Sequence, residues 1–167
     1  MKNKFISSIC VFIFGAALGI LSKLLDIHTQ IFGNLFSELP IWILLGTLIS
    51  IYSCSPQKAA YNVFLFCIGM LSTYYITAEI THSVYGYTYI KFWSVFSCIC
   101  PIFAYFTWKT KEKGFFPKVI SIGIVCVSVF CSLFLFSLDI FDCIINMVLV
   151  YFLFFHKINR ENNKSSA

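Results

Sequence analysis

Residues 119–155 decide the fold class of this chain, and they read VISIGIVCVSVFCSLFLFSLDIFDCIINMVLVYFLFF. Asp139 and Asp142 carry the only charges in this stretch. A helix that crosses the hydrocarbon core of a membrane needs roughly 20 apolar residues, so the stretch is long enough for two crossings. We therefore expect a tight helical hairpin that turns near Asp139, and one long kinked helix is the alternative.

Apolar runs of the same kind fill the rest of the chain. The 167 residues are 59% hydrophobic and 11% charged, with a mean hydropathy of +0.86. A soluble domain carries about 25% charged residues, so this composition cannot cover a water-soluble surface. The sequence predicts an all-α, polytopic membrane helix bundle of six transmembrane helices, with an odd number of spans as the main alternative. The six predicted spans cover residues 5–25, 36–53, 60–80, 89–108, 119–138 and 140–155.

The segments outside these spans are short. Residues 1–158 are expected to form one transmembrane domain, and the polar residues 159–167 a C-terminal tail. In the longest connection, residues 26–39, apolar side chains recur at helical spacing among polar ones. That pattern is typical of a helix that lies in the plane of the membrane interface, and we predict a short interfacial helix there.

The placement of charges predicts the orientation, because Lys and Arg accumulate on the cytoplasmic side of short loops. With a cytoplasmic N-terminus, ten of the twelve basic residues lie inside, and Lys23 and Lys91 fall outside. Five of the seven acidic residues lie outside: Asp26, Glu38, Glu79, Asp139 and Asp142. We therefore expect both termini in the cytoplasm and the bilayer of a bacterial cytoplasmic membrane around the helices.

Motifs for an enzyme, a metal centre or a nucleotide site are absent from the sequence. It has no Gly-rich phosphate loop, no His-Glu-x-x-His helix and no Gly-x-Ser-x-Gly elbow. Seven of its eight cysteines fall inside predicted spans, where cysteine behaves as a small hydrophobe. We expect a non-enzymatic protein with no cofactor, no metal and no nucleic-acid partner. An embedded enzyme is the alternative, and it would use Asp26, His28, Glu38, Glu79 and His82 at the outer ends of the helices.

The first predicted helix carries a face of small and polar residues. Ser8, Gly15, Gly19 and Ser22 follow one another at steps of seven, four and three, which places them along one side of the helix. Small residues let two helices approach closely within a membrane. This face therefore predicts either close packing inside the bundle or docking of a partner membrane protein.

A second constellation is acidic and lies at the start of the last helix. Asp139, Asp142 and Asn146 stand at i, i+3 and i+7, so they share one face. Polar groups within a membrane are costly and usually face the bundle interior or a wet cavity. We predict an outward-facing pocket for a cation or a small polar or zwitterionic solute. Its other residues would be Glu79, Thr73, Thr77, Lys23 and Lys91. The alternative is a set of local roles, with Asp139 as a helix cap and Lys23 paired to Asp26.

Residues 40–50 (PIWILLGTLIS), 55–60 (SPQKAA) and 62–75 resemble a group of uncharacterised small multi-pass membrane proteins from low-GC Gram-positive bacteria. In architecture alone, the chain is also similar to the substrate-binding S-components of energy-coupling-factor transporters. That resemblance implies an outward-facing site and a first helix used for docking. We expect a solute-binding or transport-associated membrane component. The alternative is an accessory, assembly or immunity-type protein that docks a partner through its first helix.

Overall fold

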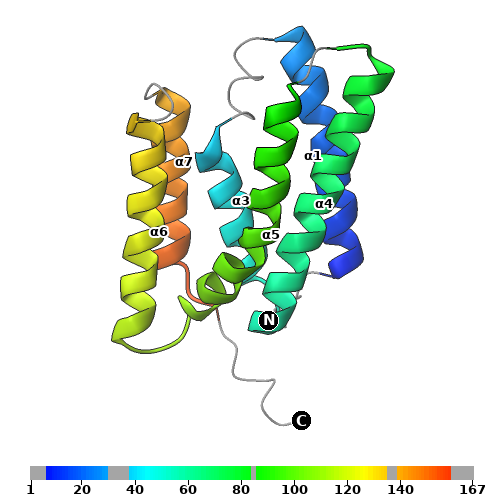
Figure 1. Ribbon diagram of the computed structural model, residues 1–167. Coiled ribbons are helices and arrows are strands. Elements are labelled where there is room, and N and C mark those ends of the chain that lie inside the picture. The colour runs from blue at the N-terminus through cyan, green and yellow to red at the C-terminus, as the bar shows by residue number, and fades with distance from the viewer. Residues whose placement is uncertain (1–6, 30–37, 84–85, 135–138, 159–167) are drawn as a thin grey trace.

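The computed structural model describes residues 7–29, 38–83, 86–134 and 139–158 (Figure 1). Within these residues the chain forms six α-helices and no β-strand, and each helix runs antiparallel to the next. The helices are α1 (Ser8–His28), α3 (Leu39–Ile51), α4 (Pro56–Ile80), α5 (Tyr87–Lys109), α6 (Phe115–Phe134) and α7 (Ile140–Val150). A π-helical turn, η1 (Tyr151–Phe155), continues α7. The all-helical prediction is therefore confirmed, and α6 and α7 form the expected hairpin.

Four of the helices are long and apolar enough to cross a membrane by themselves. They are α1, α4, α6 and residues Ile90–Lys109 of α5, whereas α3 and the continuous segment Ile140–Phe155 are shorter apolar helices. The chain is a multi-pass membrane protein on this basis. Five of the six helices begin and end within four residues of the predicted spans, and α7 does so when η1 is counted with it.

Local sequence signals explain where several helices begin and end. Ser55 precedes Pro56 at the start of α4, and its hydroxyl accepts a hydrogen bond from the Lys58 amide at 3.2 Å, as an N-cap residue does. At the end of α1, the Thr29 hydroxyl donates to the Leu25 carbonyl at 3.0 Å. Residues 26–28 thus continue α1 and do not belong to an interfacial segment, which corrects that prediction. The rest of it, residues 30–37, lies outside the described residues, as does the tail 159–167.

The short helix α3 occupies the centre of the bundle. It packs against α4 and α5 on one side and against α6 and α7 on the other (Figure 1). We call the end of the bundle where α3 begins and α1 finishes the upper end, as drawn in Figure 1, and the opposite end the lower end. At the lower end, Lys111 Nζ donates to the carbonyl oxygens of Leu153 (3.0 Å) and His156 (2.7 Å). This cation therefore satisfies carbonyls at the end of the last helix, where the helix dipole is negative.

The pair of α1 and α4 forms the tightest packing in the bundle. A Cβ atom added at Gly15 would lie 2.5 Å from the Phe66 carbonyl oxygen, and one added at Gly69 would lie 2.8 Å from the Phe12 carbonyl oxygen. A Cβ at Gly19 would overlap the Met70 carbonyl oxygen. Both helices contribute glycine to this contact, so their backbones touch directly. Only a residue without a side chain allows that approach.

Replacing Gly19 by alanine should therefore destabilise the protein. The new Cβ meets backbone, which cannot rotate away, and overpacking of this kind costs about 1–3 kcal/mol. The matched control is Gly123→Ala in α6, where an added Cβ has no neighbour within 4 Å. Thermal unfolding in detergent should show a lower midpoint for Gly19→Ala alone. Equal midpoints for the two variants would contradict the close α1–α4 contact.

Candidate functional site

The most unusual side chain in the bundle is Asp142, in the first turn of α7. It is fully buried, with 0% of its surface exposed, and no basic side chain or backbone amide among the described residues donates to its carboxylate oxygens. A buried carboxylate without a basic partner is costly, so native structures usually pair such groups. Asp142 is thus a strong acceptor that the fold places in its interior without a basic partner among the described residues.

One turn below Asp142, Asn146 adds a further acceptor. Its Nδ2 group donates to Ser132 Oγ of α6 at 3.1 Å and to the Asp142 carbonyl oxygen at 2.8 Å. Both amide protons are therefore used, and the Asn146 Oδ1 atom is left buried without a donor. The hydroxyl oxygen of Ser128, one turn below Ser132 on α6, is also buried and unpartnered among the described residues.

Glu38 completes the site, and it is half-buried directly before the first residue of α3. The helix α7, which carries Asp142, packs on both α3 and α6. Burial, followed by the negative charge of Asp142, a side-chain hydrogen bond with Asp142 and the negative charge of Asp139, raises the pKa of Glu38 from its usual 4.5 to about 7. Two neighbouring carboxyl groups resist joint ionisation, so Glu38 keeps its proton to a higher pH than an isolated glutamate does. We name Glu38, Asp142, Asn146, Ser128 and Ser132 the acceptor cluster.

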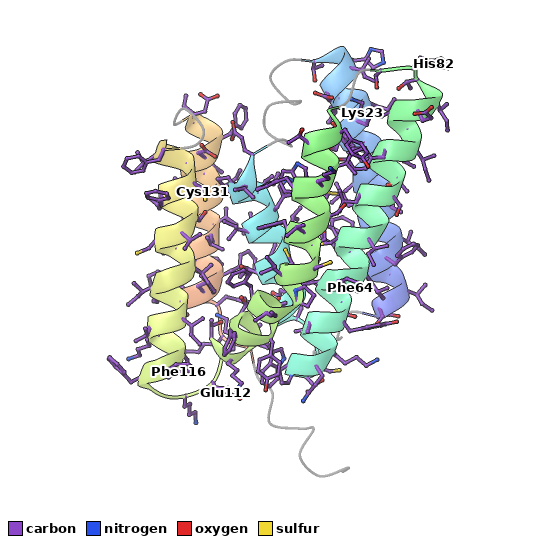
Figure 2. All side chains as sticks on the ribbon, viewed as in Figure 1. Lys23, Phe64, His82, Glu112, Phe116 and Cys131 are labelled. Carbon is purple, nitrogen blue, oxygen red and sulfur yellow. The ribbon has the colours of Figure 1, made fainter. Side chains whose placement is uncertain are left out.

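The structure separates the predicted pocket residues into two groups. Lys23 is 2% exposed, and its Nζ lies 2.8 Å from Asp26 Oδ2 and 5.2 Å from the centre of the Tyr74 ring. The local pairing is therefore the arrangement present, and Lys23 is engaged within the α1–α4 pair. Figure 2 shows Lys23 and Cys131 of α6 on opposite sides of the bundle.

The other predicted pocket residues also lie away from Asp142. The Thr73 hydroxyl donates to the Ala16 carbonyl at 2.8 Å, so it links α4 to α1. Thr77 and Glu79 follow on α4, which packs on α1 and α5, whereas α7 packs on α3 and α6. Lys91 is exposed on α5, with its Nζ 4.8 Å from the Tyr87 ring centre. The structure thus brings Asp142 and Asn146 together but leaves these four residues elsewhere.

Asp139 keeps a local role, because its Oδ1 accepts from the Ile140 amide at 3.2 Å at the start of α7. Glu38, by contrast, is the partner that the sequence reasoning missed. The sequence placed its carboxyl at the same end of the bundle as Asp142. Nothing in the sequence indicated that α3 and α7 are neighbours.

The face of small residues on the first helix is covered within the chain. Gly15 and Gly19 are buried against α4, and the Ser8 hydroxyl donates to Asn62 Oδ1 of α4 at 2.7 Å. Ser22 is buried as well. The face therefore serves packing inside the bundle in this structure, and a partner would have to separate α1 from α4 to reach it.

The raised pKa of Glu38 predicts a pH dependence of stability. In the unfolded chain Glu38 ionises near pH 4.5, whereas in the folded protein it holds its proton to about pH 7. The folded state therefore binds more protons in this window, and its stability should fall as pH rises from about 4.5 to about 7. Unfolding midpoints measured across this range should fall less in Glu38→Gln than in the wild type. Parallel pH profiles for the two proteins would contradict the assignment.

Comparisons with known proteins give no family for this chain and no role for these residues. No protein-family model, no curated protein and no solved structure matches this chain. Among the described residues, no group of three or more His, Cys, Asp or Glu side chains is arranged to hold a metal ion. The acceptor cluster and its chemistry are therefore the basis for assigning a function.

Proposed function

We propose that this protein is a transport-associated membrane component that binds a small monovalent cation in the acceptor cluster. One observation carries the proposal: the carboxylate of Asp142 is fully buried, and the group that it meets among the described residues is a second acid, Glu38, and not a basic side chain. A buried charge is tolerated when an opposite charge or a coordinated ion compensates it. The cluster supplies oxygen acceptors but no basic side chain, so a cation from outside the chain is the fitting partner.

The size and the donor atoms of the site support a small ion. Asp142 is fully buried and lies outside the cavity of about 460 Å³ between α3, α4, α5 and α6, so a small ion suits the site better than an organic solute does. Carboxylate, amide and hydroxyl oxygens are hard ligands, which suit ions such as Na⁺ and K⁺ better than softer metals. The cluster has two carboxyl groups, and a pKa of about 7 leaves Glu38 partly protonated near neutral pH. This protonation lowers the negative charge of the cluster, which favours a monovalent over a divalent cation.

The orientation of the chain forms part of this proposal. We infer that α3 and α7, although short, also cross the membrane, which gives six crossings with both termini on the cytoplasmic side. The support is the charge distribution: among the described residues, six of eight basic residues lie at the lower end and five of six acidic residues at the upper end. The acceptor cluster then faces the outside of a bacterial cytoplasmic membrane, and no catalytic step is assigned to it.

An accessory protein that docks through its first helix remains the alternative function. The observation against it is that α4 covers Gly15, Gly19 and Ser22. A partner would have to separate α1 from α4 to reach these residues, whereas cation binding at Asp142 does not require that separation. We therefore favour cation binding over docking.

The proposal predicts that monovalent cations stabilise the protein and that Asp142 is required for this effect. The detergent-purified protein would be melted in NaCl, KCl or choline chloride at equal ionic strength. A ligand at a hundredfold excess over its Kd stabilises the folded state by about 2.7 kcal/mol, so Na⁺ or K⁺ should raise the midpoint relative to choline. Asp142→Asn should abolish the ion-dependent rise. It should also raise the midpoint in choline chloride, because it removes an uncompensated buried charge.

Asp139→Asn is the matched control for this experiment. It removes the same charge three residues earlier, at an exposed cap position, and should keep the ion-dependent rise. If Asp142→Asn and the wild type gain equally in Na⁺ and K⁺, or if no cation stabilises the wild type more than choline does, the cation site is excluded.

A further inference from the structure

A cavity of about 460 Å³ lies between α3, α4, α5 and α6. Its walls include Trp42 and Gly46 of α3, Phe66 of α4, Trp93 of α5 and Gly123 of α6. This volume falls within the range of roughly 300–1,000 Å³ that is typical of ligand pockets. The cavity is distinct from the acceptor cluster, because Asp142, Asn146 and Glu38 do not line it.

Three of the four hydroxyl side chains in the cavity wall donate to carbonyls of their own helices, and the fourth is Thr47. The Ser50 hydroxyl donates to the Gly46 carbonyl at 2.6 Å, and the Ser97 hydroxyl to the Trp93 carbonyl at 2.8 Å. Thr107 does the same with the Phe103 carbonyl at 2.8 Å. A polar ligand would lose its hydrogen bonds to water here and form few with the wall, whereas a hydrocarbon ligand has no such hydrogen bonds to lose. The wall therefore selects an apolar occupant.

Two glycines enlarge this cavity and do not close a helix contact. An added Cβ at Gly46 or at Gly123 would have no neighbour within 4 Å, in contrast to Gly15 and Gly19 in the α1–α4 pair. They thus leave open space on two walls, one on α3 and one on α6. Filling such space with a ligand restores the contacts that an empty cavity forfeits.

The dimensions and the rim of the cavity match a lipid chain. Its lining on α3 runs from Leu39 to Ser50, which at 1.5 Å per residue is about 17 Å. One acyl chain spans half of a hydrocarbon core of about 30 Å, so the length of the cavity is close to that of one extended chain. At the rim, Phe103 of α5 and Val127 of α6 are exposed, so the cavity is continuous with the apolar surface that faces the bilayer.

We infer that the cavity binds one acyl chain of a membrane phospholipid, which enters from the bilayer between Phe103 and Val127 and fills the space between α5 and α6. The chain lies against Trp42, whose side chain is 8% exposed in the protein alone. The phospholipid is a resident ligand that completes the packing on this side of α3. The inference does not depend on cation binding, since the two sites share no residue.

The test uses Trp42 as a reporter, because the chain has three tryptophans and the other two are Trp93 and Trp108. Trp93→Phe and Trp108→Phe leave Trp42 alone in the full-length protein. This protein would be reconstituted in phosphatidylcholine bilayers with or without bromine in the middle of the acyl chains, since bromine quenches tryptophan fluorescence on contact. Trp42 should be quenched despite its burial. Gly46→Leu should reduce the quenching by roughly half, because the new side chain occupies the pocket.

Ala17→Leu is the matched control, since it adds a similar side chain at an exposed position of α1. It should leave the quenching of Trp42 unchanged, and circular dichroism would show that both variants are folded. Mass spectrometry of the purified wild type should also detect a retained phospholipid that Gly46→Leu lacks. Equal quenching in Gly46→Leu and Ala17→Leu would overturn the inference. Retention of an apolar molecule other than a phospholipid, or of none, would overturn it as well.

Discussion

The lack of water in the hydrocarbon core is the constraint on which the rest of this structure depends. Every backbone group there must find a partner inside the protein, so the chain is helical wherever it is apolar. The side chains obey the same constraint. Ser53, Ser121 and Ser132, like three hydroxyls of the cavity wall, donate to the carbonyl four residues earlier in their own helix. Against this background, the exceptions among the described residues are the Asp142 carboxylate, Asn146 Oδ1 and the Ser128 hydroxyl, and Asp142 is the one that can carry a charge.

The central helix α3 separates two kinds of packing. On one side, glycines bring the backbones of α1 and α4 into direct contact, and that pair also contains the ion pair of Lys23 with Asp26. The acceptor cluster lies on the other side, between α3, α6 and α7, and the apolar cavity lies between α3, α4, α5 and α6. The unsatisfied charge and the unfilled volume are the features that a ligand stabilises.

Two residues of the site, Asp142 and Asn146, were predictable from the chain alone. They stand one turn apart on an apolar helix, so they were expected to face the interior of the bundle. The prediction failed for Lys23, because a local partner three residues away competes with any distant acid and needs no tertiary contact. It also missed Glu38, whose importance rests on the proximity of α3 and α7. The polar residues were thus identifiable individually, but their grouping was not.

The sequence by itself determined the helical class, the position of each turn and the face of each helix that carries polar or small residues. These properties are local, because they follow from apolar runs, prolines, caps and the helical repeat. Only the tertiary structure decided that α3 is central, that α1 packs on α4, and that Asp142 meets Glu38 and not Glu79. The physical reason is that lipid solvates every apolar helix face almost equally well. Hydrophobic pattern therefore carries little information about which helices touch, and close packing and hydrogen bonding make that choice.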